Sequence, residues 1–281
     1  SAFVKTLTGT VLDFRDRNIS VTTEYLIDEI RIAREGAETI LLNKIPDRGW
    51  LIINPIQMTA DSEYVNESLS MIHRLTMNDV HLLTDENSRK FGLDSPELSI
   101  SLTESTGIKQ TFNLGKRFEE TGMSYIYIEG EKEIFETRAN SLYEIDLDKM
   151  IFFAPLSVSS DDVEQIEMVQ GDVKQILQRK YKDDREVFYS DEKEIPQEDY
   201  ISLYVNLMSM TVDGYAEKKP EQAMILALTL KRDQQENISV YIYDYEDEYY
   251  AMSSSLNQYQ FIISKDKVEL VIKWFDKINQ N

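Results

Sequence analysis

The sequence contains no cysteine, only two histidines, six prolines and ten glycines among its 281 residues. Without cysteine the chain forms no disulfide, and thiolate catalysis and Cys-ligated metal sites are excluded. This absence fits an extracytoplasmic bacterial protein and a cytosolic protein equally well. Long apolar runs are also missing, because segments such as "IFFAPLSV" are too short to span a bilayer.

Basic residues are in the minority. The chain has 30 Lys and Arg against 51 Asp and Glu, which gives a formal net charge of −21. Phosphate recognition depends on clustered Lys and Arg, so we expect no nucleic-acid partner. The charge also disfavours contact with an anionic membrane face. The sequence begins "SAFVK", with no signal peptide, and we expect a targeting or membrane-anchoring segment to precede it in the native protein.

The most informative feature present is an internal repeat. The segment "ISVTTEYLIDEIRI", from Ile19, resembles "LSVSSDDVEQIEM", from Leu156, and Ile30 aligns with Ile166 at an offset of 136 residues. The same offset aligns two further elements: Leu51–Ile53 aligns with Val187–Tyr189, and on the following helix Tyr64 aligns with Tyr200 and Ile72 with Met208. The chain is therefore predicted to contain two copies of one unit.

The offset then changes to 124, which aligns Pro96 with Pro220 and Tyr125 with Tyr249. We therefore expect about twelve extra residues in the first copy, and we place them near Leu82 to Leu93.

Periodicity predicts the elements of each unit. "DEIRIARE", "ETILLNKI" and "GWLIIN" read as strands, and a helical spacing follows. Its apolar face is Tyr64, Val65, Ser68, Leu69, Ile72 and Leu75 in the first copy, and Tyr200, Ile201, Tyr204, Val205 and Met208 in the second. Three or four antiparallel strands come next. We also expect Trp50, Leu51, Ile53, Leu69 and Ile72 to be largely buried, and the chain to end in a helix with the apolar stripe Val268, Val271, Ile272, Phe275 and Ile278.

The predicted fold class is therefore α+β, with two tandem homologous units, each a mainly antiparallel sheet with one principal helix. Residues 1–18 are expected to form a lead-in segment, residues 19–150 the first repeat unit and residues 151–281 the second.

The stretch "YIYDYEDEYYAM", residues 241–252, is predicted to be a strand, an acidic turn and a strand. Alternation sends Ile242 to the core and Tyr241, Tyr243 and Tyr245 to the opposite face. These three tyrosines are the candidate partner-binding residues, because Tyr is favoured at interfaces. The alternatives are a purely structural hairpin and a calcium site at the acidic tip, although the tip lacks the ligand spacing of an EF-hand.

No catalytic, cofactor-binding or metal-binding residue is assigned from the sequence. Of the two histidines, His73 is expected to be a partly exposed helix residue, and it has no evident catalytic partner. Phosphate loops, nucleophile elbows and His-Glu-x-x-His pairs are missing. The acid pairs Asp161–Asp162 and Asp183–Asp184 could support glycosidase chemistry only at a suitable separation.

Several segments together resemble a bacterial family of unknown function, the domain of unknown function 4340. They are "LTGTVLDFRDRNI", "RGWLIINPIQMTADSEYVNESLSMIHRL" and "KFGLDSPELSISL", and the resemblance covers the first copy from about Val11 to Tyr143. The second copy departs from the pattern, with Glu186 in place of Trp50 and Lys218–Pro220 in place of the Gly-Leu-Asp-x-Pro turn.

The resemblance implies an envelope protein with an N-terminal membrane anchor and an extracytoplasmic body, associated with ABC-type export or gliding-motility-like transporter components. It supplies no catalytic residue. The expected function is a non-enzymatic accessory or binding subunit of a membrane transport complex, anchored to the bacterial cytoplasmic membrane, with no cofactor and an unknown ligand. The alternatives are an envelope hydrolase that uses carboxylates and a structural scaffold without a ligand.

Overall fold

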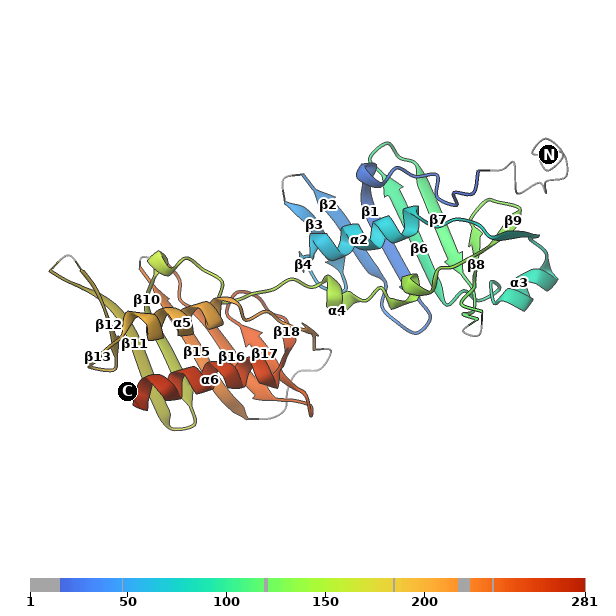
Figure 1. The fold of residues 1–281 in the computed structure, drawn as a ribbon. Helices are drawn as coiled ribbons and strands as arrows, with labels where there is room; N and C mark the ends of the chain where they lie inside the picture. Colours follow the sequence, from blue (N-terminus) through green and yellow to red (C-terminus); the bar gives the residue numbers. More distant parts are fainter. Residues whose placement is uncertain are drawn as a thin grey trace, which may run out of the picture. The chain divides into compact units, whose positions relative to one another are not determined.

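The computed structural model describes residues 16–46, 48–118, 121–183, 185–216, 223–233 and 235–280. The chain forms two compact units that divide between Met150 and Ile151 (Figure 1). Each unit is built on one antiparallel nine-stranded sheet, with few helices. The predicted α+β fold of two tandem sheet units is therefore confirmed. Most of the lead-in segment, residues 1–15, lies outside the described residues.

In the first unit the sheet order is β4-β3-β2-β1-β6-β7-β8-β9-β5. Its strands are β1 (Ile27–Arg34), β2 (Ile40–Ile45), β3 (Gly49–Asn54), β4 (Met58–Thr59), β5 (Asp79–Leu82), β6 (Leu98–Glu104), β7 (Lys109–Leu114), β8 (Ser124–Ile128) and β9 (Glu133–Thr137). Its helices are η2 (Glu24–Leu26), α2 (Ser62–His73), α3 (Asp85–Phe91), η3 (Asn140–Glu144) and α4 (Leu147–Met150).

In the second unit the order is β13-β12-β11-β10-β15-β16-β17-β18-β14. Its strands are β10 (Val163–Gln170), β11 (Val173–Lys182), β12 (Arg185–Ser190), β13 (Lys193–Ile195), β14 (Gly214–Tyr215), β15 (Met224–Arg232), β16 (Ile238–Asp244), β17 (Tyr249–Ser254) and β18 (Gln260–Ser264). Its helices are η4 (Ser160–Asp162), α5 (Gln197–Met208) and α6 (Lys265–Gln280).

The two units share one topology. Strand for strand, the second order repeats the first, from β4 and β13 at one edge to β5 and β14 at the other. The principal helices also occupy equivalent places, because α2 contacts β3 and α5 contacts β12, its counterpart. The predicted internal repeat is therefore confirmed at the level of the fold.

The strand register corrects the second offset. Ile30 pairs with Leu102, and its counterpart Ile166 pairs with Leu230, so β6 and β15 are 128 residues apart and not 124. On the next strands, Ile126 pairs with Phe135 and Met252 with Phe261, which are 126 residues apart. The Pro96 alignment was misleading because the connection before β6 differs in length between the units. Its partner, Pro220, lies outside the described residues.

The extra length of the first unit lies where it was expected, but it amounts to seven residues, 15 against 8, and not about twelve. Residues 83–97 connect β5 to β6 and include α3, whereas residues 216–223 make the equivalent connection between β14 and β15. Helix α3 begins after Thr84, whose hydroxyl accepts a hydrogen bond from Asn87 N at 3.1 Å. It ends at Gly92, which takes the left-handed conformation that a glycine C-cap favours.

Strand alternation decides which residues of β3 form the core. Trp50 and Ile52 point to the face covered by α2 and are fully buried, whereas Leu51 and Ile53 lie on the opposite face and are half-buried. The expected burial of Trp50, Leu69 and Ile72 is confirmed. The expectation for Leu51 and Ile53 was wrong, because an apolar run in a strand cannot place neighbouring side chains on one face.

Helix α2 has the predicted buried face, and its N-cap Asp61 accepts hydrogen bonds from the backbone N–H groups of Glu63 and Tyr64. In α5 the predicted face was wrong by one position. The buried residues are Asp199, Tyr200, Leu203 and Leu207, whereas Ile201 and Val205 are exposed. The offset between the helices is 135, from the N-cap Asp61 to the N-cap Pro196, and not 136.

The terminal helix α6 lies beside α5 on the same face of the second sheet (Figure 1). Its predicted stripe is buried except for Ile272, which is half-buried. Lys277 Nζ and Asp199 Oδ1, 3.0 Å apart, join the two helices. Within the described ranges, no helix is both long and apolar enough to cross a membrane.

Candidate functional site

The three candidate tyrosines lie on or next to β16, on the sheet face opposite α5 and α6. Ile242 is completely buried, while Tyr241 is 37% exposed and Tyr243 is half-buried. The predicted alternation along β16 is therefore present. Tyr245 follows the end of the strand at Asp244 and is half-buried.

Most neighbours of these tyrosines on adjacent strands are small. Tyr241 lies between Ala227 on β15 and Ser253 on β17. Tyr243 lies between Ala251 on β17 and Met224 on β15, and Met224 is itself exposed. We call Tyr241, Tyr243 and Tyr245 the tyrosine strip.

An acidic hairpin tip adjoins the tyrosine strip. Asp244, Glu246, Asp247 and Glu248 are all exposed, and the last three line a hollow of about 420 Å³ together with Tyr249. Lys265 Nζ lies 3.5 Å from Asp244 Oδ1, and at this surface position such an ion pair is weak. The strip therefore combines aromatic surface with a concentration of negative charge.

A second group of polar side chains that could act together lies at the β5 edge of the first sheet. Asp79 and Glu136 are directly opposite each other on β5 and β9, and His81 lies two residues beyond Asp79. All three side chains therefore project from the same sheet face. One potential metal-ligand atom from each residue lies within 4.8 Å of the other two. His81 Nε2 and Glu136 Oε2 are 3.3 Å apart.

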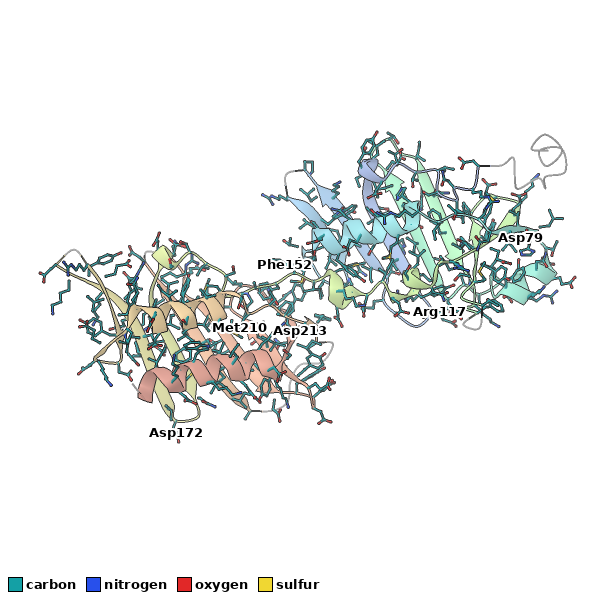
Figure 2. All side chains as sticks on the ribbon, in the orientation of Figure 1. Asp79, Arg117, Phe152, Asp172, Met210 and Asp213 are labelled. Atoms are coloured by element: carbon teal, nitrogen blue, oxygen red, sulfur yellow. The ribbon has the colours of Figure 1, made fainter. Side chains whose placement is uncertain are left out.

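Aromatic residues surround this group. Phe91, on α3, stacks on Tyr125 of β8 with ring centroids 3.8 Å apart, and the His81 ring lies 5.0 Å from Phe91 and 5.8 Å from Tyr125. Phe91 also forms a small buried cluster with Leu93 and Ile134, and Tyr125 packs against this cluster. Figure 2 labels Asp79 at this end of the first unit, close to α3. The inserted helix α3 therefore contributes an aromatic side chain that packs beside the polar group.

Tyr125 is electrostatically coupled to the carboxylates. Burial raises the pKa of its phenol above the ordinary value of 10.0, and a hydrogen bond to Glu136 and the charges of Glu136 and Asp79 raise it further. The phenol is therefore neutral at physiological pH and is available as a donor to the Glu136 carboxylate.

The other residues considered from the sequence are not brought together. His73, half-buried on α2, has Nδ1 2.9 Å from Leu69 O and Nε2 3.1 Å from Thr22 Oγ1. Asp161 is exposed and lies 3.4 Å from Arg179. The second acid pair includes Asp184, which is outside the described residues.

Sequence reasoning did not identify the group of Asp79, His81 and Glu136. The Asp-x-His spacing in a strand is a weak signal that two potential ligands share a face. The third, Glu136, is 55 residues from His81 in the chain and becomes a neighbour only through the pairing of β5 with β9.

Comparison with protein families gives one match. The family model described as "Domain of unknown function (DUF4340)" matches residues 50–226, from β3 of the first unit to β15 of the second. The match covers more than half of the chain and spans both repeats, so it extends beyond the first copy to which the resemblance was assigned. Searches of curated proteins and of solved structures gave no match. The chain belongs to the family of the domain of unknown function 4340.

Proposed function

We propose that this protein is a non-enzymatic, extracytoplasmic accessory or binding subunit of a membrane transport complex, and that the tyrosine strip is its docking surface. The observation that carries the docking proposal is the combination of Tyr241 and Tyr243 on the sheet face opposite α5 and α6 with the acidic tip beside them. Tyr supplies a large contact area with few rotatable bonds, which suits recognition. The transport association is what the family resemblance implies.

Charge indicates which kind of partner surface the proposed interface would bind. The chain carries a formal net charge of −21, and the tip concentrates four exposed carboxylates next to the strip. A partner protein with a basic surface is therefore complementary, and added salt is expected to slow its association. The partner is expected among the membrane components of the transporter.

The test is affinity capture of the full-length, membrane-anchored protein from its native envelope. Changing Tyr241→Ser and Tyr243→Ser together is expected to reduce recovery of transporter components at least tenfold, with an unchanged thermal midpoint. The matched control is Tyr25→Ser with Tyr181→Ser, because both tyrosines are exposed, Tyr25 belongs to the first unit and Tyr181 lies on β11, which is not adjacent to β16. Unchanged recovery with the strip variant, or an equal loss with the control, would contradict the proposal.

A further inference from the structure

We propose that Asp79, His81 and Glu136 form a binding site for one divalent transition-metal ion of the zinc class. The site lies at the β5 edge of the first sheet, beside the inserted helix α3. It is separate from the tyrosine strip, which belongs to the second unit, and it does not depend on the proposed docking function.

The strand register places two like charges directly opposite each other. Asp79 and Glu136 are cross-strand partners on one face, an arrangement that repulsion destabilises. Glu136 forms an ion pair with His81, and among the described residues no Lys or Arg forms an ion pair with Asp79 or Glu136. A bound cation between the two carboxylates would replace the repulsion with attraction to both.

The distances fit a small metal ion. With bonds of about 2.0–2.1 Å, two ligands of a tetrahedral zinc ion are roughly 3.4 Å apart. His81 Nε2 and Glu136 Oε2 are 3.3 Å apart. The Asp79 carboxylate completes the group within the 4.8 Å limit, and because its side chain is exposed it can rotate toward the other two ligands. Three protein ligands leave a fourth position for water.

The second unit shows that the fold does not require this group. Phe135 on β9 pairs with Val80 on β5. Its counterpart on β18, Phe261, pairs with Tyr215 on β14, so Tyr215 corresponds to Val80 and the offset between β5 and β14 is 135 residues. At this offset Gly214 replaces Asp79 and Ala216 replaces His81, and the β9–β18 offset of 126 places Ile262 at the position of Glu136. Small and apolar residues therefore occupy the equivalent positions at the sheet edge of the second unit. The polar group is particular to the unit that also contains α3.

The surroundings hold the histidine in place. The His81 ring lies against Phe91 and Tyr125, with ring centroids 5.0 and 5.8 Å away, and this packing restricts its rotation. A ligand side chain that is already fixed loses less freedom when it binds a metal ion. One imidazole with two carboxylates favours zinc and its neighbours over calcium and magnesium, which prefer ligand sets made only of oxygen.

The test is calorimetric titration of the whole chain with zinc chloride alone, and separately with calcium and magnesium chloride. We expect one saturable zinc site per chain, with zinc bound at least tenfold more tightly than calcium or magnesium. His81→Asn and Glu136→Gln should each weaken zinc binding at least tenfold. His73→Asn, which removes the other histidine of the same unit, should leave zinc binding unchanged.

A crystal of the unmodified chain soaked in zinc provides a readout that does not depend on any variant. Anomalous scattering at the zinc edge should give a peak between Asp79, His81 and Glu136. A peak elsewhere with none at these residues, a titration without a saturable zinc site, or equal zinc affinity in the wild type and His81→Asn would each overturn the proposal. Preference for calcium or magnesium would overturn the assignment to the zinc class.

Discussion

The indole Nε1 of Trp50 donates a hydrogen bond of 3.0 Å to Oδ1 of Asn66, which joins strand β3 to helix α2. Trp50 is only 1% exposed, so its ring is buried beneath the helix. The helix that covers the first sheet is thus held by a polar contact as well as by its apolar face. In the second unit the register of β11 with β12 places the buried Phe188, and not Glu186, at the position of Trp50. Phe188 packs on Tyr200 of α5, and α5 is also joined to α6 through Asp199 and Lys277.

Removing the acceptor of this bond should destabilise the first unit. Asn66→Ala removes the acceptor, and because Asn66 is exposed, water can partly replace it, so we expect a loss of about 0.5–1.5 kcal/mol in the free energy of unfolding. Chemical denaturation measures this loss. The neighbouring Glu67 is exposed on the same helix, so Glu67→Ala should change stability by no more than about 0.5 kcal/mol. Equal effects of the two changes would show that the hydrogen bond adds nothing.

The packing of α2 can be tested in the same way. Leu69 is 2% exposed, and Leu69→Ala should cost roughly 2–5 kcal/mol because it leaves a cavity beneath the helix. Ile201, at 46% exposure on α5, is the matched control, and Ile201→Ala should cost about 0.5 kcal/mol or less. A denaturation midpoint that does not move with Leu69→Ala would mean that α2 does not cover the sheet.

Glu104 makes stability sensitive to acid. Its buried carboxylate accepts hydrogen bonds of 2.6 Å from the Thr106 hydroxyl and from the Thr23 backbone N–H. These bonds, the one from Thr106 first, lower the pKa of Glu104 below its ordinary value of 4.5. A lowered carboxyl pKa contributes stability that is present above the ordinary value and is lost as the pH falls through the folded value.

Glu104→Gln should therefore reduce the difference in unfolding free energy between neutral pH and pH values below 4.5. Denaturation curves across this range measure the difference. Glu131→Gln changes an exposed carboxylate of the same unit and should leave the slope against pH as it is in the wild type. A slope that is unaffected by Glu104→Gln would refute the assignment.

Three tyrosines should make the protein sensitive to alkali. Burial raises the pKa of Tyr143, Tyr200 and Tyr204 to about 12 from the ordinary 10.0. Because the folded value is the higher one, the stability that these groups contribute is complete below pH 10.0 and is lost as the pH rises toward 12.

Tyrosinate absorbance and circular dichroism, recorded together against pH, test this expectation. Ionisation of the buried tyrosines should coincide with unfolding, and Tyr200→Phe should reduce the loss of stability above pH 10.0. Tyr25→Phe changes an exposed side chain and should not alter that loss. Full ionisation of all tyrosines in a chain that remains folded would contradict the prediction.

Local pattern in the sequence determined the elements and their repetition. The alternation of Tyr241, Ile242 and Tyr243 predicts which residue is buried because neighbouring side chains of a strand project to opposite faces. The stripe of Val268, Val271 and Phe275 predicts the buried face of α6 because the helical period is local in the same way. The repeat was detectable because one short stretch of β-strand resembles another directly.

Tertiary structure decided the relationships between distant residues. The correct alignment of Tyr125 is with Ala251, not Tyr249, and only the pairing of β8 with its neighbours establishes this register. Ile201 has an apolar side chain but is exposed, because a shift of one residue turns a helical position by 100°, or about a quarter of a turn. Asp79, His81 and Glu136 meet because β5 returns to the far edge of the sheet and pairs with β9. Strand pairing over such a separation depends on the packing of the whole sheet, and no short segment of the sequence records it.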